Sequence, residues 1–546
     1  MTPRATTAST PGDSDGEPVD AEQAGVTDSQ VPPRRLWAGR VAGPGLALVT
    51  YFLLRLDEAL GTPARTTAAI GVLLAVWWMT EAMPLAATAL LPIVLFPLLG
   101  VLAVADATAP YADPNIFLFM GGFMIALAMQ KWDLHKRIAL ITVRAVGTRP
   151  PRLIGGFMIA TAFISMWVSN TATTVLMLPI GLSVLLLVLD RVKADSDGGS
   201  AADDVRDRTS SDGAVTTLIE DRDTRNFAVA LMLGIAYAAS IGSLATLIGT
   251  PPNLILSAFV EQNYDITIGF GQWMLLGLPL SVTFLALAWV VLTRIAFRSD
   301  LKEIPGGKEM IQTELDALGR MSRGEWTVLG VFVTTAFLWV LRQPLADWDA
   351  LVSVLPFMTE LTDASIAIAG ALALFLIPVD ARRGVSALDW KTAQQLPWGV
   401  LLLFGGGLSL AAAVQDSGLD EYIGEQVGEL GVLPLILIVA ATTGIVLLLT
   451  EITSNTATAA AFLPVLGGVA VGLDITPLAL LAPAALAASC AFMLPVATPP
   501  NAIVFGSGYV TVGQMLRGGA LLNVIGIVLI TAAVYLLGGV ALGIEF

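Results

Sequence analysis

The chain has 546 residues, of which 55% are hydrophobic and only 13% are charged, and its mean hydropathy is +0.77. This apolar content excludes a soluble globular protein and indicates a polytopic membrane protein. The formal net charge is −15, and a single cysteine and a single histidine exclude a disulfide, a multi-cysteine metal site and a histidine cluster.

The chain begins with an acidic segment of low complexity. We predict that residues 1–40 form a disordered cytoplasmic tail, and that the acidic stretch 195–223 forms a solvated loop of the same kind. The N-terminal region lacks the short apolar core and cleavage site of a secretory signal. We therefore expect the first membrane span to act as its own insertion signal.

A membrane crossing needs roughly 20 residues, and apolar runs near this length predict eleven spans. They cover residues 41–56, 66–83, 86–104, 114–130, 226–259, 272–296, 324–341, 363–378, 397–413, 478–510 and 518–541. Two further apolar stretches, 152–190 and 432–470, carry a Ser-Asn-Thr sequence near the middle with Pro and Gly nearby. We predict that both are re-entrant hairpins, because non-helical backbone survives at membrane depth only where protein or a water cavity surrounds it.

The polar sequences in these stretches are repeated. SNTAT at 169–173 returns unchanged at 454–458, and GTPPN at 249–253 has a counterpart in ATPPN at 497–501. The two Thr-Pro-Pro-Asn sequences interrupt the spans 226–259 and 478–510, which we predict to be broken helices. Paired, Gly/Pro-interrupted apolar segments of this kind are the sequence feature that best indicates a transporter's binding site.

The distribution of basic residues predicts the orientation. On this layout all of the 29 Lys and Arg except Arg55, Arg65 and Arg342 fall on the side that holds the N-terminus. This bias places the N-terminus in the cytoplasm and the C-terminus outside. Because an odd number of spans separates the two hairpins, the second half of the chain is expected to be inverted relative to the first.

Inversion is expected to bring the two hairpin tips together near the middle of the membrane. Neither hairpin core nor either Thr-Pro-Pro-Asn break contains Lys, Arg or His, so we expect bound sodium ions to neutralise an anionic substrate. The hydroxyls of Ser165 and Ser169, and of Thr450 and Ser454, are hard oxygen ligands spaced four residues apart on one helical face. Substrate carboxylates would accept hydrogen bonds from four tip residues: Asn170, Thr171, Asn455 and Thr456.

Several polar and small residues also have a purely structural interpretation. Isolated Ser, Asn and Thr residues in membrane helices commonly bond neighbouring helices, but two copies in register favour a binding site. The glycine runs 121–122 and 405–407 favour close helix packing. Glu81 and Glu451 are intramembrane carboxylates, for which we favour structural hydrogen bonding over a direct functional role.

These motifs, together with the sequence WWMTEAMP at 77–84, resemble the divalent anion/sodium symporter family, which carries di- and tricarboxylates or sulfate. The resemblance implies an all-α polytopic inverted repeat with about eleven transmembrane helices and two re-entrant hairpins. It also implies a homodimer and an elevator movement of a transport domain against a scaffold. Amphipathic helices at 131–146 and 416–430 would frame the moving part.

The resemblance also assigns domains and site residues. Scaffold helices would occupy 41–148 and 298–430, and transport elements 149–297 and 431–546. The first sodium would take Ser165, Ser169, Asn170 and Gly249, and the second would take Thr450, Thr453, Asn455 and Ala497. The substrate would contact Asn170, Thr171, Thr250, Asn455, Thr456, Thr498 and Pro499.

The sequence therefore predicts a secondary active transporter in the plasma membrane that couples two or more Na⁺ ions to a divalent anion, with a C4-dicarboxylate such as succinate favoured. A sodium-independent dicarboxylate exchanger and a sulfate transporter stay open, as does, more remotely, an anion channel. A primary pump is disfavoured because the chain lacks a P-loop, and an enzyme is disfavoured because no nucleophile elbow or Ser/His pair accompanies the motifs. Membrane lipid is an expected partner and nucleic acid is not.

Overall fold

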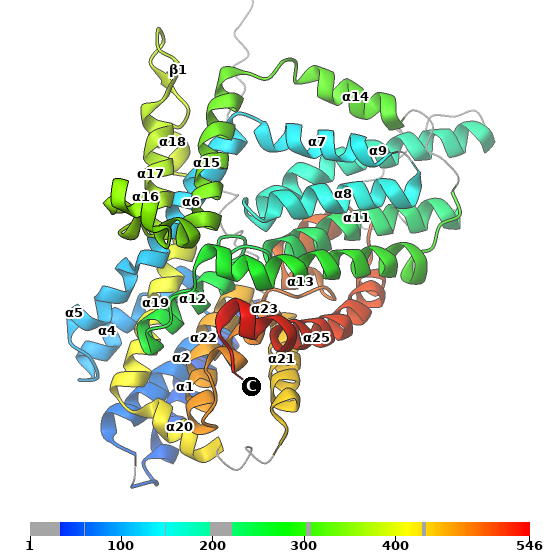
Figure 1. The fold of residues 1–546 in the computed structure, drawn as a ribbon. Coiled ribbons are helices and arrows are strands. Elements are labelled where there is room, and N and C mark those ends of the chain that lie inside the picture. The colour runs from blue at the N-terminus through cyan, green and yellow to red at the C-terminus, as the bar shows by residue number, and fades with distance from the viewer. Residues whose placement is uncertain are drawn as a thin grey trace, which may run out of the picture.

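The computed structural model describes residues 33–58, 60–147, 149–196, 221–301, 307–427 and 433–545. The predicted tail up to residue 32 and most of the predicted acidic loop, residues 197–220, lie outside the described residues. The described part is almost entirely helical and is drawn in Figure 1.

The first half of the chain runs from α1 to the π-helical turn η4. Its elements are α1 (Pro33–Leu54), α2 (Thr62–Thr80), α3 (Leu85–Thr88), α4 (Leu91–Leu98), α5 (Val104–Thr108), η2 (Ala109–Ala112), α6 (Pro114–Lys131), α7 (Leu134–Val146), α8 (Pro150–Ser165), α9 (Asn170–Ser196), α11 (Arg222–Ser243), α12 (Pro251–Tyr264), α13 (Phe270–Val290) and η4 (Val291–Ala296).

The second half follows the same order and adds one small antiparallel β-hairpin, β1–β2, in which Pro378 lies opposite Ser386. Its elements are α14 (Gly307–Ala317), α15 (Arg323–Ala346), α16 (Asp349–Val354), η5 (Pro356–Thr359), α17 (Asp363–Leu376), β1 (Pro378–Asp380), β2 (Val385–Ser386), α18 (Trp390–Ala393), α19 (Trp398–Asp416), α20 (Leu419–Val427), α21 (Leu435–Thr450), α22 (Asn455–Gly472), α23 (Leu478–Ala488), η7 (Pro495–Ala497), α24 (Pro499–Gly506) and α25 (Val512–Leu542).

Within these described ranges, nine helices are long and apolar enough to cross a membrane. Four shorter apolar helical segments accompany them, at Leu85–Leu98, Asp363–Leu376, Leu435–Thr450 and Leu478–Ala488. The last two are the first arm of the second hairpin and the first half of the second broken helix. The all-α polytopic fold class is therefore confirmed.

Two predicted segments differ from the structure. In place of one span over 86–104, the chain forms the short helices α3, α4 and α5, which are separated near Leu90 and by the loop that contains Gly100 at φ +71°. Prolines 84, 92 and 97 and this left-handed glycine explain the interruption, since none of them favours an uninterrupted helix. Residues 33–40, which the sequence analysis placed in the tail, form the first turns of α1.

Both hairpins and both broken helices are present. The first hairpin pairs α8 with α9 across a tip at 166–169, and the second pairs α21 with α22 across a tip at 451–454. The broken helices are α11–α12, unwound at 244–250, and α23–α24, unwound at 489–498. The sequence placed all four interruptions at the repeated motifs, and the structure agrees.

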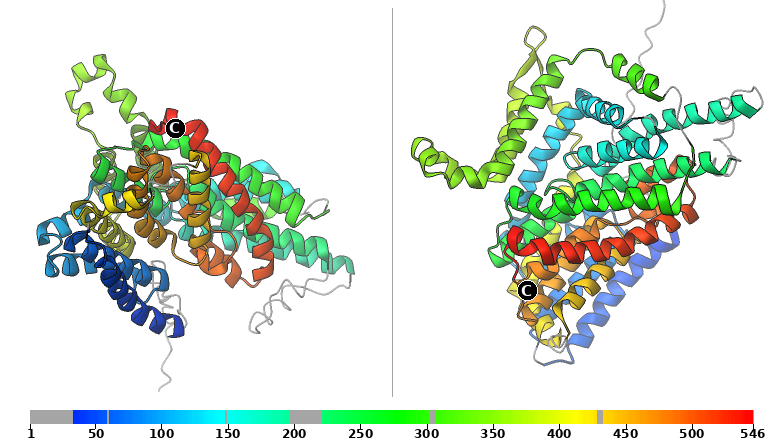
Figure 2. Two further views of the ribbon diagram at one scale, coloured as in Figure 1. Left: turned by 90° about the horizontal axis from the view of Figure 1, so that it is seen from below. Right: turned by 45° about the vertical axis from the view of Figure 1, so that its right-hand side comes forward.

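The hairpins pack on the broken helices in a crossed manner. Helix α9 contacts α11 of its own half and α24 of the other half, while α22 contacts α23 of its own half and α12 of the other. Figure 1 shows α7, α8 and α11 stacked in successive layers, with α15 and α17 standing beside one end of this stack, at its left. Figure 2 shows α1, in dark blue, on the periphery of the molecule.

Glycines allow the close approach of helices that the sequence predicted. A Cβ atom added to Gly121 of α6 would lie 2.6 Å from the backbone of Ala367 in α17, and one added to Gly406 of α19 would lie 2.5 Å from the carbonyl oxygen of Ala89. No side chain fits at these contacts. The glycine runs are therefore packing surfaces, as predicted.

Candidate functional site

The first hairpin tip gathers three oxygen atoms. Helix α8 ends at Ser165, whose Oγ lies 2.7 Å from Oδ1 of Asn170, the first residue of α9. The same Oγ lies 2.7 Å from the carbonyl oxygen of Ala239 in α11. A hydroxyl carries only one proton, so one of these two close oxygen pairs has no proton between them. An oxygen-rich, proton-poor cluster of this kind suits a hard cation.

The orientation of the Asn170 amide is fixed by a further contact. Its Nδ2 donates to Oγ of Ser243 at 3.3 Å, which directs Oδ1 toward Ser165. Ser243 in turn lies against Gly249, where an added Cβ would come within 2.3 Å of the Ser243 carbonyl oxygen. Three of the predicted first-sodium residues, Ser165, Asn170 and Gly249, are thus brought to one place.

The second tip repeats this arrangement. Oγ1 of Thr450 lies 2.7 Å from Oδ1 of Asn455, the first residue of α22, and 2.7 Å from the carbonyl oxygen of Ala488 in α23. Both hydroxyl residues, Ser165 and Thr450, are fully buried. Each half of the chain therefore holds one cluster of three oxygens that share a single hydroxyl proton. We call these the first and second oxygen clusters.

Two other predicted sodium residues direct their side chains elsewhere. Oγ of Ser169 accepts a hydrogen bond from the N–H of Ala172 and so closes the first turn of α9. Thr453 Oγ1 contacts the carbonyl oxygen of Leu449 at 2.8 Å and the hydroxyl of Thr458 at 2.6 Å. Neither side chain joins an oxygen cluster.

The start of each second hairpin helix can face an anion. Helices α9 and α22 begin at Asn170 and Asn455, and N–H groups of a first helical turn carry partial positive charge. Asn170, Thr171, Asn455 and Thr456 are all half-buried, and so they keep some exposed surface at the tips. By contrast, α12 and α24 each begin with two prolines, which have no N–H to donate.

The remaining predicted residues lie at the starts of these second half-helices. Thr250 and Thr498 are buried, Ala497 is buried in the short turn η7, and Pro499 is exposed. Thr250 Oγ1 lies 3.2 Å from Oγ of Ser489 at the end of α23. The two halves are joined there, through their broken helices.

The two tips are linked through the broken helices and not through a direct hydrogen bond between their motif residues. Their described side-chain bonds run to Ala239 and Ser243 in the first half and to Ala488 in the second. None of these three partners was predicted from the sequence. Ala239 and Ala488 contribute backbone carbonyls, which leave no signature in a sequence, and Ser243 lies too far before the Thr-Pro-Pro-Asn motif to be recognised as part of it.

Glu451 makes the structural hydrogen bonds that the sequence analysis favoured. Its buried carboxylate accepts from the backbone N–H groups of Phe492, Met493 and Leu494 at 2.7–3.1 Å, and from the amide of Asn523 at 2.7 Å. It thereby holds the unwound segment of the second broken helix on the second hairpin tip.

The first half achieves the same connection differently. Met166 occupies the position that corresponds to Glu451, and its carbonyl oxygen accepts from Thr246 Oγ1 at 2.5 Å. Thr246 corresponds to Leu494 in the alignment of the two Thr-Pro-Pro-Asn motifs. The hairpin tip and the unwound segment are therefore joined by a neutral hydroxyl in the first half and by a carboxylate in the second.

One basic side chain from outside the repeated motifs approaches a tip. Nη2 of Arg35 in α1 donates to the carbonyl oxygens of Met79 at 2.7 Å and Ile452 at 3.2 Å. Ile452 precedes Thr453 in the second tip. Among the described residues, Arg35 is the one basic side chain with a hydrogen bond to either tip, and that bond goes to the backbone.

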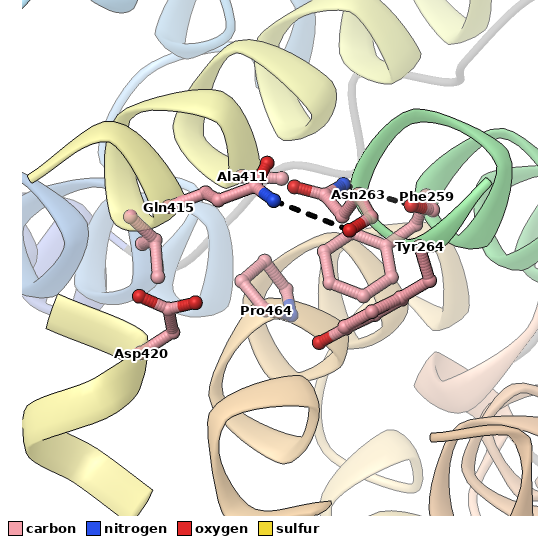
Figure 3. Close-up of a pocket in the computed structure, with 8 residues that line it drawn as sticks. Phe259, Asn263, Tyr264, Ala411, Gln415, Asp420 and Pro464 are labelled. Carbon is pink, nitrogen blue, oxygen red and sulfur yellow. Dashed lines mark hydrogen bonds between the residues drawn. The ribbon is translucent and has the colours of Figure 1, made fainter. Parts of the chain in front are cut away.

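A small pocket lies apart from the tips, where α12 meets α19, α20 and α22 (Figure 3). Nε2 of Gln415 donates to the backbone carbonyl of Asn263 at 3.2 Å across this seam. Burial raises the pKa of the Asp420 carboxyl on the opposite wall. The pocket marks a boundary between the first broken helix and the amphipathic helix of the second half.

Comparison with known proteins identifies the family of the chain. A family model described as "Sodium:sulfate symporter transmembrane region" matches residues 36–542. The chain belongs to this family. The match makes it a multi-pass membrane transporter and not an enzyme.

Two relatives agree with this assignment, and one solved structure shares the fold. The chain is 42% identical over 510 residues to a sodium-dependent dicarboxylate transporter of Staphylococcus saprophyticus, covering 93% of this chain and 92% of the relative. It is 41% identical over 509 residues to the transporter of the same name from Staphylococcus aureus USA300, with the same coverage. The crystal structure of the Alcanivorax borkumensis YdaH transporter aligns with a TM-score of 0.51 over 87% of this chain and 98% of that one, at 16% identity, which shows a shared fold.

Proposed function

We propose that this protein is a sodium-coupled symporter of a C4-dicarboxylate such as succinate. The observation that carries the proposal is the pair of oxygen clusters. Each contains a hydroxyl, an amide oxygen and a backbone carbonyl with one hydroxyl proton among them, around Ser165 and Thr450. Two Na⁺ ions, one at each cluster, would together supply two positive charges, which would balance the two negative charges of a dicarboxylate.

The substrate would lie between the two hairpin tips. Its carboxylates would accept hydrogen bonds from Asn170 and Thr171 at one end and from Asn455 and Thr456 at the other, with the N-termini of α9 and α22 behind them. Thr250, Thr498 and Pro499 would complete the site when the tips move apart. The sodium-dependent dicarboxylate transporters that are 41–42% identical to this chain support this choice of substrate and ion.

Coupling would follow from the position of Asn170 and Asn455. Each offers its Oδ1 to an oxygen cluster, while its backbone lies at the helix start that would face the substrate. A cation in the cluster would fix the tip and so favour the anion, and by linkage the anion would favour the cation to the same extent.

Movement of the hairpins and broken helices as a transport unit against a scaffold is part of the proposal. The transport domain would comprise residues 149–297 and 431–546, and the scaffold would comprise residues 41–148 and 298–430. The protein would be a homodimer in the plasma membrane. The N-terminus would be cytoplasmic and the C-terminus external. The seam in Figure 3 would be one of the surfaces that change during transport.

Uptake of radiolabelled succinate into proteoliposomes tests the function. We expect saturable uptake that requires an inward sodium gradient and is reduced by malate. Undiminished counterflow without sodium would identify an exchanger, and failure to saturate would identify a channel. Stronger competition by sulfate or citrate than by malate would overturn the choice of a C4-dicarboxylate.

A further inference from the structure

Two fully buried asparagines that the proposed sites do not use bridge the breaks in both broken helices. Asn253, the third residue of α12, donates through Nδ2 to the carbonyl oxygens of Ser243 at 3.4 Å and Thr246 at 2.8 Å. These carbonyls belong to the end of α11 and to the unwound segment after it. One side chain therefore fastens the second half-helix to the first.

Asn501, the third residue of α24, makes the same contacts in the second half. Its Nδ2 donates to the carbonyl oxygens of Ala491 and Leu494, both at 3.1 Å. Ser243 corresponds to Ala491 and Thr246 to Leu494 in the alignment of the motifs. The bridge is thus duplicated together with the oxygen clusters.

Each bridge leaves one atom without a partner. Oδ1 of Asn253 and Oδ1 of Asn501 are buried and have no hydrogen-bond partner among the residues that the structure describes. Turning either amide over would place Oδ1 against two carbonyl oxygens, so the orientation is determined by the bridge. A buried acceptor without a donor is unfavourable. Its presence in both halves indicates that the geometry of the bridge offsets that cost.

The residues that the bridges hold also contact the hairpin tips. Ser243, whose carbonyl is held by Asn253, accepts the amide of Asn170 on its hydroxyl. Thr246, also held by Asn253, donates its hydroxyl to Met166. Leu494, held by Asn501, donates its N–H to Glu451. Each bridge therefore connects to the tip that carries the oxygen cluster of its own half.

We infer that Asn253 and Asn501 are positioning residues for the two sodium sites, each fixing the unwound segment against the tip so that the oxygen cluster is assembled before the ion arrives. This inference deepens the proposed function and rests on it. It requires that loss of either bridge weakens sodium binding more than it weakens substrate binding at saturating sodium.

The test replaces each asparagine by aspartate, which keeps the shape and an oxygen but loses both amide protons. Sodium binding to the purified full-length protein is measured with radioactive sodium in the absence of substrate. Loss of two hydrogen bonds is expected to raise the half-saturating sodium concentration about tenfold in Asn253→Asp and in Asn501→Asp. If the unpartnered oxygen were itself a sodium ligand, the added carboxylate would bind sodium at least as tightly as the wild type, and that result would overturn the inference.

Asn226→Asp is the matched control. Asn226 lies near the start of α11 in the first broken helix, and its amide makes one exposed bond to the carbonyl oxygen of Arg298 away from the break, so sodium binding should be unchanged. If the aspartate variants do not fold, Asn253→Thr and Asn501→Thr, each of which retains one donor, should show a smaller rise. Wild-type sodium affinity in the threonine variants would also overturn the inference.

Uptake assays separate this inference from the proposed substrate. In each folded variant, the sodium concentration that gives half-maximal uptake should rise, while the KM for succinate at saturating sodium should change by less than the sodium constant. If the wild type binds sodium but carries no dicarboxylate, the proposed substrate is wrong. The comparison of sodium binding between the wild type and the variants would still test the positioning role of the two asparagines. Should the wild type bind no sodium, both would fall.

Discussion

Thr250 and Ser489 join the two halves of the molecule through hydroxyl oxygens 3.2 Å apart. Thr250 directly precedes the second part of one broken helix, and Ser489 directly follows the first part of the other. Both are buried, so the contact is protected from water. The two repeats are therefore connected at the point where each helix is interrupted.

Removing this contact should lower substrate affinity. A lost hydrogen bond between neutral groups is worth about 1 kcal/mol, so we expect Thr250→Val to raise the KM for succinate by about fivefold. Ser489→Ala should have a similar effect. Because the two hydroxyls are partners, the double variant should be little worse than either single one in a double-mutant cycle. Strict additivity would show that the hydroxyls act independently.

Asn170→Ala and Asn455→Ala should each abolish succinate uptake while the protein is still made and inserted. Either change removes the amide oxygen of one cluster and leaves the hydroxyl of Ser165 or Thr450 with only a backbone partner. Transport in proteoliposomes and expression by size-exclusion chromatography are the measurements. Asn226→Ala, which alters an exposed bond to the carbonyl of Arg298, is the control. Wild-type uptake in either tip variant would contradict the shared site.

Thr171→Ala and Thr456→Ala should weaken substrate binding more than sodium binding. Both residues directly follow the cluster asparagines in the first turns of α9 and α22, but their side chains lie outside the oxygen clusters. The comparison is between the KM for succinate at saturating sodium and the half-saturating sodium concentration at saturating succinate. A change confined to the sodium constant in Thr456→Ala would reverse the assignment.

Glu451→Ala should destabilise the protein more than Met166→Ala does. Loss of the carboxylate leaves three backbone N–H groups and the Asn523 amide without their acceptor, at about 1–3 kcal/mol for each buried group. We expect a lower melting temperature in detergent, by several degrees relative to the wild type. An unchanged melting temperature would mean that water or another acceptor replaces the carboxylate.

Stability should decrease as pH falls below the ordinary pKa of histidine. Burial lowers the pKa of His135 in α7, against a smaller raising effect of Asp133, and Lys136 lowers it further. The folded state therefore favours neutral histidine. The contribution of His135 to the free energy of unfolding is highest above about pH 6.5 and decreases as pH falls toward the folded-state pKa. Thermal unfolding of the wild type and His135→Gln at pH 5 and pH 8 checks this. The variant should lose less stability on acidification.

Much of this architecture could be predicted because the duplication is visible in the chain itself. SNTAT at 169–173 and 454–458 located both tips, and the Thr-Pro-Pro-Asn sequences located both breaks, since prolines at the start of a helix force an interruption before it. The amphipathic helices that the resemblance implied at 131–146 and 416–430 correspond to α7 and α20.

What the sequence could not supply are contacts made by the backbone or by residues without a repeat. The carbonyls of Ala239 and Ala488 complete the oxygen clusters, yet any residue type could provide them. The four donors around Glu451 lie 41 to 72 positions away along the chain, and three of them are backbone groups. Arg35 reaches Ile452 only because α1 packs beside α2, and that packing has no signature in the local pattern of residues.

The hydrogen bonds that join tip and broken helix differ between the two halves, at Glu451 and at Met166. This difference limits which residues can be exchanged between the halves. Replacing Met166 by glutamate would bury a charge beside Thr246, whose hydroxyl already has an acceptor. Replacing Glu451 by methionine would leave the backbone N–H groups that it binds without an acceptor. Either of these two exchanges alone is therefore unfavourable unless the residues around it change as well. A chain built from two identical copies of either half would therefore have the wrong connection at one tip, because each connection depends on partners that only one half provides.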